Sequence, residues 1–267
     1  MHNYTEGNSP SLRAQLGVGW NRALPAPFSF QNGVKLDGVN DYFVIPSMVG
    51  RTIGNNGGIT IEFWMRDVNP IGTYLFGIRT DVNNAKSFGL RASALAIPAG
   101  STVPYPSGFT NGVDNVTHNY FCIRLNNFNA NGFEVFVNAF PKVTYAMGAT
   151  WVFPQTLTEF LIGLEVPTTF SQSPFDELRI YDAIIGTDEI SQNYNLGLGN
   201  NPAKTEKLIG WYNFQGAELD TSLYPGGNPS GWASGIYGIR DYSGQNNHLM
   251  PVNQTNNATL GGNIISF

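Results

Sequence analysis

Acidic side chains that could form a catalytic pair are the first candidates for chemistry in this sequence. Retaining glycosidases place two carboxyl groups about 5 Å apart, and one of them attacks the sugar. Asp176 and Glu177 are neighbours in an alternating segment, so their side chains are expected on opposite faces of a strand. Asp176 and Asp182 share a face but would lie roughly 20 Å apart along an extended strand. The spacing therefore predicts no carboxylate pair and no enzyme activity.

The histidines and the cysteine indicate no nucleophilic site either. His2, His118 and His248 lie in an arm, a loop and a turn, and no Gly-x-Ser-x-Gly turn precedes a helical segment. Cys122 is the single cysteine, which excludes an intrachain disulfide and a zinc site built from thiolates. Its place in an alternating segment indicates a packed and inert side chain.

Aromatic and charged side chains that share a face favour carbohydrate recognition. Trp64 alternates with apolar residues and falls on the same side of its segment as Glu62 and Arg66. Sugars present both apolar faces and hydroxyl groups, which aromatic rings flanked by charged groups match. The alternative is that Trp64 packs beneath a loop or beneath the C-terminal segment. The predicted glycan-binding residues are Trp64, Glu62, Arg66, Arg124, Arg179, Tyr181, Tyr105 and Trp232.

Side-chain oxygens in turn-like segments make calcium the one cofactor to consider. A hard cation of this kind needs about six to eight oxygen ligands that converge from several loops. The carboxylates between residues 37 and 41 are more simply explained as caps on backbone amides in a turn. We expect that no cofactor is required. The candidate calcium ligands are Asp37, Asp41, Asp81 and Asp114.

The elements that must position these residues are short strands. Apolar and polar residues alternate with period two at 59–66, 121–126 and 133–138, which is typical of strands with one face on a core. Clusters of Asn and Gly at 55–58 and 126–132 supply the positive φ angles that tight turns require. No helical period extends beyond about three turns. The pattern therefore predicts an all-β, antiparallel sandwich.

Three motifs carry a resemblance to a known family. They are VKLDGVNDYFVIPS at 34–47, GGITIEFWMR at 57–66 and FDELRIYDAIIGTDEISQNYN at 175–195. In order and spacing they resemble the laminin G-like branch of the concanavalin A-like lectin/glucanase superfamily. The resemblance implies a jelly-roll β-sandwich whose outward front-sheet face forms the usual glycan groove. Because this fold carries binding modules, structural modules and enzymes alike, it does not define an activity.

The chain divides into three expected parts. Residues 1–29 are predicted to be an extended N-terminal arm, residues 30–200 the sandwich, and residues 201–267 a C-terminal segment. The last part contains GWYNFQG and RDYSGQNNHL, which resemble the opening strand and turn of a laminin G-like module, so the module is interpreted as permuted or exchanged. A segment of this size cannot bury its own core. We expect it to complete or extend the sandwich, in cis or on another subunit.

Charge and hydropathy restrict the partners. The formal net charge is −5, only 12% of residues are charged, and no cluster of Lys and Arg exists, which excludes nucleic acid as an expected partner. No run of 18 apolar residues and no signal peptide is present, so neither a membrane span nor export is predicted.

These features together predict a non-enzymatic structural and recognition protein. The missing export signal, the missing disulfide and the weakly charged, Asn- and Gly-rich composition favour a phage virion surface component, such as a spike, fibre or capsid decoration. Its expected partners are host surface glycans and either virion proteins or further copies of itself. The alternatives are a lectin-like adhesin, secreted or on a bacterial cell surface, and a divergent glycoside hydrolase.

Overall fold

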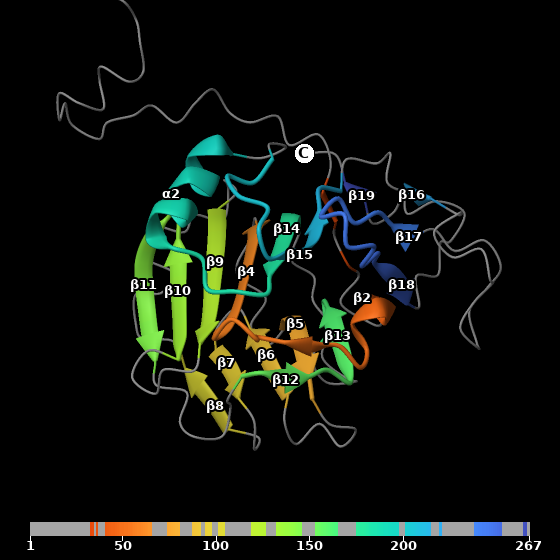
Figure 1. The fold of residues 1–267 in the computed structure, drawn as a ribbon, viewed down its shortest axis with the longest axis horizontal. Coiled ribbons are helices and arrows are strands. Elements are labelled where there is room, and N and C mark those ends of the chain that lie inside the picture. Colours follow the sequence, from red (N-terminus) through yellow and green to blue (C-terminus); the bar gives the residue numbers. More distant parts are fainter. Residues whose placement is uncertain are drawn as a thin grey trace, which may run out of the picture.

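The described part of the chain is nearly all β, with antiparallel strand pairs and one α-helix (Figure 1). This confirms the predicted all-β sandwich. No described helix is long and apolar enough to cross a membrane. The predicted arm at 1–29 lies outside the described residues. The computed structural model describes residues 33–34, 36, 41–65, 74–80, 87–91, 94–97, 101–104, 119–126, 132–145, 153–164, 175–197, 201–214, 219–220, 238–252 and 264–265.

The larger sheet contains eight strands. Seven of them follow the order β11-β10-β9-β4-β14-β1-β19, and β15 also pairs with β14. All pairs are antiparallel. The strands are β1 (Gly33–Val34), β4 (Gly58–Met65), β9 (Asn119–Asn126), β10 (Phe133–Val137), β11 (Phe140–Tyr145), β14 (Phe175–Tyr181), β15 (Leu208–Tyr212) and β19 (Ile264–Ile265).

The second sheet contains seven strands in the order β18-β2-β13-β5-β6-β7-β8. They are β2 (Tyr42–Val44), β5 (Tyr74–Arg79), β6 (Ser87–Arg91), β7 (Ala94–Ile97), β8 (Ser101–Pro104), β13 (Glu159–Ile162) and β18 (Met250–Val252). One α-helix, two small ribbons and a 3₁₀ turn complete the described elements. The helix is α2 (Thr187–Leu196), the ribbons are β3 (Thr52–Ile53) with β12 (Gln155–Thr156) and β16 (Leu219–Asp220) with β17 (Gly238–Ile239), and the turn is η1 (Pro46–Met48).

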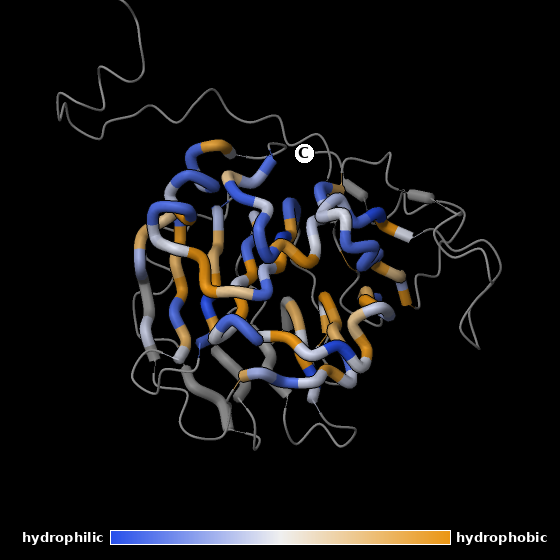
Figure 2. Tube along the Cα trace, in the orientation of Figure 1, coloured by the Kyte–Doolittle hydropathy of each residue, from blue (hydrophilic) through white to orange (hydrophobic). Residues whose placement is uncertain are grey.

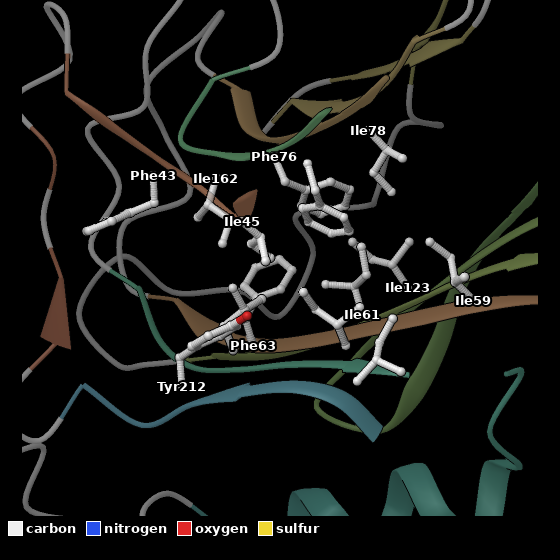
Figure 3. Packing of buried hydrophobic residues seen from close by; sticks show 14 of the residues in the cluster. Phe43, Ile45, Ile59, Ile61, Phe63, Phe76, Ile78, Ile123, Ile162 and Tyr212 are labelled. Atoms are coloured by element: carbon white, nitrogen blue, oxygen red, sulfur yellow. The ribbon is translucent and has the colours of Figure 1, made fainter. Parts of the chain in front are cut away.

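The main core lies between the two sheets. Alternate residues of β4 and β9 point inward, and the rings of Phe63 and Phe121 stack at 5.4 Å with an interplanar angle of 10°. Figure 2 shows how hydropathy varies along the chain: hydrophobic residues recur in the strands, whereas α2 is mostly hydrophilic. The predicted alternation at 59–65 and 121–125 is therefore confirmed. Figure 3 shows part of this core, including Phe43, Ile45, Ile59, Ile61, Phe63, Phe76, Ile78, Ile123, Ile162 and Tyr212.

Helix α2 (Thr187–Leu196) packs on the outward face of the eight-stranded sheet (Figure 1). Its first turn contains Asp188 and Glu189, whose charges favour the positive end of the helix dipole. It ends at Gly197, which has a φ of 75° and donates its N–H to the Asn193 and Tyr194 carbonyls. A second apolar cluster, which includes Trp64, Tyr120 and Ile190, fills the space between helix and sheet.

The C-terminal segment completes both sheets. Strand β15 pairs with β14, β19 with β1, and β18 with β2. Tyr212 and Phe214 are fully buried in the main core. The expected completion of the sandwich by this segment is therefore confirmed, and in this structure the pairing occurs within one chain.

Candidate binding site

The outward face of β4 and β14, where the sequence predicts a sugar platform, is covered by α2. Trp64 is only 5% exposed, and Glu62, Arg179 and Tyr181 are at most 1% exposed. The ring of Tyr194 from α2 stacks on Trp64 at 5.8 Å. The prediction that these four side chains form an open platform is therefore wrong, because the helix that follows β14 occupies their face.

The other predicted binding residues are not gathered with them. Arg124 lies on the outward face but is held by the protein, with its guanidinium 2.9 Å from Glu134, 3.1 Å from the Ile185 carbonyl and over the Phe136 ring. It links β9, β10 and the segment before α2. The remaining candidates, Arg66, Tyr105 and Trp232, lie outside the described residues.

The calcium candidates can be placed only in part. Asp41 is 4% exposed and has interactions within the protein. Within the described ranges, no group of three or more His, Cys, Asp and Glu side chains could hold a metal ion. The other candidates, Asp37, Asp81 and Asp114, lie outside those ranges, so calcium binding stays a prediction.

A bulge in β14 changes the direction of its acidic side chains. The pairing with β4 shifts register between Asp176 and Arg179, and Glu177 has a φ of 50°. Asp176 lies opposite Trp64 in the register, while the carboxylate of Glu177 reaches Arg179 at 3.2 Å. Both acids therefore lie on the outward face, and the prediction of opposite faces is wrong. Their exposure of 0% and 1% keeps both away from a substrate in this structure.

Glu62 is the centre of a buried polar network between α2 and the sheet. Its carboxylate accepts hydrogen bonds from the hydroxyls of Tyr120 and Tyr181 and, at 3.0 and 3.1 Å, from the Asn193 amide. Burial raises the pKa of Glu62 even though the Arg179 charge and the hydrogen bonds from Tyr120 and Asn193 oppose the shift. Burial and the nearby Glu62 charge also raise the pKa of Tyr120 well above its ordinary value. The hydrogen bonds that Glu62 accepts join β4 to α2 through Asn193, so they anchor the helix.

Two aromatic side chains at the edge of this network are the candidate site, which we call the aromatic corner. Trp211 from β15 lies opposite Arg179 of β14 and is partly buried, whereas Tyr242 is 39% exposed. Their ring centroids are 5.8 Å apart at an interplanar angle of 60°. The indole Nε1 of Trp211 donates to Glu177 at 3.0 Å, and the Arg179 guanidinium lies 5.9 Å from the ring centroid. The Trp211 ring is thus fixed from within the protein.

The turn at 241–247 holds Tyr242 in place. The Asp241 carboxylate accepts the backbone N–H groups of Trp211, Ser243 and Asn247 at 2.8 to 2.9 Å, and the Ser243 hydroxyl at 2.7 Å. Tyr242 itself donates its N–H to the Trp211 carbonyl at 2.8 Å. Because one carboxylate joins the turn to β15, the two rings of the corner have a defined relative position.

Sequence patterns alone do not identify the aromatic corner. One signal was present, since Trp211 precedes the core residue Tyr212 in a strand and so faces away from the main core. The side chains that surround Trp211 could not be predicted from the sequence, because β15 pairs with β14, a segment about thirty residues earlier in the chain. Tyr242 appeared only as part of a turn motif.

Comparison with known proteins agrees with the fold. No protein-family model and no curated protein sequence matches the chain. Among solved structures it is similar to a proposed carbohydrate-binding protein from Bacteroides ovatus, with 16% identity and a TM-score of 0.53 over 85% of this chain. This similarity, together with the strand pairing, defines the chain as an antiparallel β-sandwich with a lectin-like fold. The chain spans 58% of the length of the Bacteroides protein.

Two further structures have lower similarity. The heptameric SAP-like pentraxin from Limulus polyphemus has 13% identity and a TM-score of 0.44, over 62% of this chain and 82% of its own. The CBM40 of the Ruminococcus gnavus IT-sialidase, bound to α2,3-sialyllactose, has 13% identity and a TM-score of 0.44, over 61% of this chain and 98% of its own.

Proposed function

We propose that this protein is a non-enzymatic recognition module that binds glycans at the aromatic corner. The observation that carries the proposal is the exposed Tyr242 ring set at 60° to the Trp211 ring. The Trp211 ring is held by its hydrogen bond to Glu177, and the Tyr242 backbone by its hydrogen bond to the Trp211 carbonyl. Two rings at this angle offer an apolar face and an apolar edge to one sugar ring. Hydroxyl groups around the sugar ring would remain at the polar rim and in water.

The fixed geometry favours binding as well as stability. The Trp211 indole N–H is already paired with Glu177, and its backbone N–H with Asp241. A ligand would therefore not have to order the ring, which lowers the entropic penalty of binding. Trp211 lies on the same sheet face as Trp64, and α2 leaves it partly exposed. It therefore takes the role in aromatic recognition that the sequence predicts for Trp64.

The biological setting is proposed from the sequence. The weakly charged, Asn- and Gly-rich composition and the absence of an intrachain disulfide support a surface component of a phage virion that contacts host glycans, together with virion proteins or further copies of itself. A lectin-like adhesin, secreted or on a bacterial cell surface, is the second candidate, supported by the fold shared with the Bacteroides ovatus protein. Genes that neighbour the coding sequence would distinguish virion assembly from surface adhesion.

Substitution of the corner tests the proposed site. Tyr242→Ala and Trp211→Ala should each weaken binding on a glycan array by about tenfold or more, because each removes a stacking ring. Phe140→Ala is the matched control, since Phe140 is 62% exposed in the β10–β11 hairpin and lies outside the corner. Tyr242→Ala should leave the melting temperature nearly unchanged. Unaltered glycan binding by both corner variants would contradict the proposed site.

A further inference from the structure

We infer that the aromatic corner binds glycans that carry no acidic group and discriminates against sialylated, uronic or sulfated ones. The inference rests on the proposed function and concerns the ligand class of the same site. It follows from the charges that surround the two rings. Those charges are the carboxylates of Glu62, Asp176, Glu177 and Asp241 and the guanidinium of Arg179.

Two of the carboxylates touch the corner directly. Glu177 accepts the Trp211 indole N–H at 3.0 Å, and Asp241 accepts the Trp211 backbone N–H at 2.9 Å. Asp241 is 5% exposed, and its carboxylate also accepts the backbone N–H groups of Ser243 and Asn247 in the turn that carries Tyr242. A negatively charged sugar stacked on the Trp211 ring would not touch these buried carboxylates but would lie within the field of both.

The cation beneath the corner cannot compensate for them at the surface. Arg179 is only 1% exposed, and its guanidinium is bound by Glu177 at 3.2 Å and faces Glu62 at 3.9 Å. A ligand carboxylate could not reach it without displacing these partners. Even if Glu62, whose pKa burial raises, is counted as neutral, the carboxylates of Asp176, Glu177 and Asp241 outnumber the guanidinium groups of Arg179 and the exposed Arg240.

The flanking surface cations are also engaged within the protein. Lys204 lies 3.6 Å from Glu189 of α2, and Arg240, two residues before Tyr242, has an interaction partner of its own. An acidic sugar thus meets a net negative field, whereas stacking of an uncharged sugar on the rings is not affected by it. The discrimination comes from repulsion of the wrong ligand.

Matched ligand pairs test the inference. The full-length protein is assayed against lactose and 3′-sialyllactose, and against N-acetyllactosamine and its 6-sulfated form, at low and high ionic strength. The uncharged member of each pair should bind about tenfold more strongly at low salt, given the Coulomb energy of charges several ångströms apart near a protein surface. The preference should shrink as salt is raised, because salt screens the repulsion.

A charge-neutral variant locates the source of the preference. Glu177→Gln keeps an oxygen acceptor for the Trp211 indole but removes one negative charge, so the ratio of uncharged to acidic binding should fall. Glu159→Gln is the matched control, because it removes the same charge from the other sheet, where Glu159 pairs with Arg79. If Glu177→Gln fails to fold, the salt series on the unaltered protein decides the question.

The outcomes separate the inference from the proposed function. Equal or stronger binding of the acidic members would overturn the inference and leave glycan recognition intact. A preference that does not change with salt would also overturn it, because the repulsion would then not be electrostatic. Binding to no glycan in the panel or on the glycan array would overturn the proposed function and, with it, the inference.

Discussion

At the scale of single residues, Trp64 is an aromatic side chain whose type suits a sugar-binding site but which packs in the interior of the protein. Its ring lies between the sheet and α2, stacked on Tyr194 at 5.8 Å and tilted against Tyr120 at 5.5 Å. Large buried aromatic side chains contribute strongly to stability through both area and ring contacts. Trp64 therefore attaches the helix to the sheet.

Replacing this ring should be costly. We expect Trp64→Ala to lower the free energy of unfolding by about 3–5 kcal/mol, since it leaves a cavity beneath α2. Urea denaturation followed by circular dichroism would measure the change. Phe140→Ala, at a 62% exposed aromatic, should shift it by less than about 0.5 kcal/mol. Equal unfolding midpoints for Trp64→Ala and the unaltered protein would show that Trp64 is not packed as described.

At the scale of elements, one amide on α2 and one carboxylate on β4 hold the helix to the sheet in addition to the packing at Trp64. The Asn193 amide nitrogen donates to both oxygens of Glu62, and its oxygen accepts the backbone N–H of Ala203. A single side chain thus joins α2 to β4 and to the segment that leads into β15. A buried polar network of this kind is favourable only while every member is paired.

The raised pKa of Glu62 gives this network a defined pH dependence. In the unfolded chain Glu62 has its ordinary pKa of 4.5, and in the folded protein its pKa is higher. Between these two pKa values the folded state therefore holds more protons than the unfolded state. The contribution of Glu62 to stability should therefore fall as pH rises through 4.5 toward the raised pKa, and stay constant above it. Below 4.5 it should not change.

The difference between two pH series isolates this contribution. The free energy of unfolding is measured from acid to neutral pH for the unaltered protein and for Glu62→Gln, which keeps the side-chain shape. The variant should lack the decline described above, because it has no proton to release at this site. Parallel pH curves for the two proteins would show that Glu62 titrates in the folded state as it does in the unfolded chain.

Local patterns predicted the strands better than they predicted what lies on them. Period-two alternation is a property of each segment alone, and it correctly identified β4, β9 and β10. The direction of the Glu177 side chain depends on the bulge in β14 where it pairs with β4, and the burial of Trp64 depends on the packing of α2 over the sheet. Both are tertiary events that no local pattern encodes. For the same reason, the aromatic corner of Trp211 and Tyr242 could be identified only from the structure.

At the scale of the whole molecule, the sandwich depends on its C-terminal segment. Strand β15 supplies Tyr212 to the main core, and β18 and β19 cover the edges of β2 and β1. Without them, β14 and β2 would lose paired neighbours, and the buried ring of Phe214 would leave a gap in the apolar core. The permuted or exchanged origin of this segment, which the sequence resemblance suggests, stays a prediction.

Truncation after Asn200 tests this dependence. We expect the 1–200 fragment to be insoluble or to associate, because it exposes unpaired strand edges together with apolar surface. Size-exclusion chromatography and circular dichroism of the fragment give the measurement, with the full-length chain as control. Because the pairing lies within one chain here, the melting temperature of the full-length protein should not depend on its concentration. A concentration-dependent melting temperature would indicate exchange between chains, and a soluble, monomeric, folded fragment would make the segment an independent appendage.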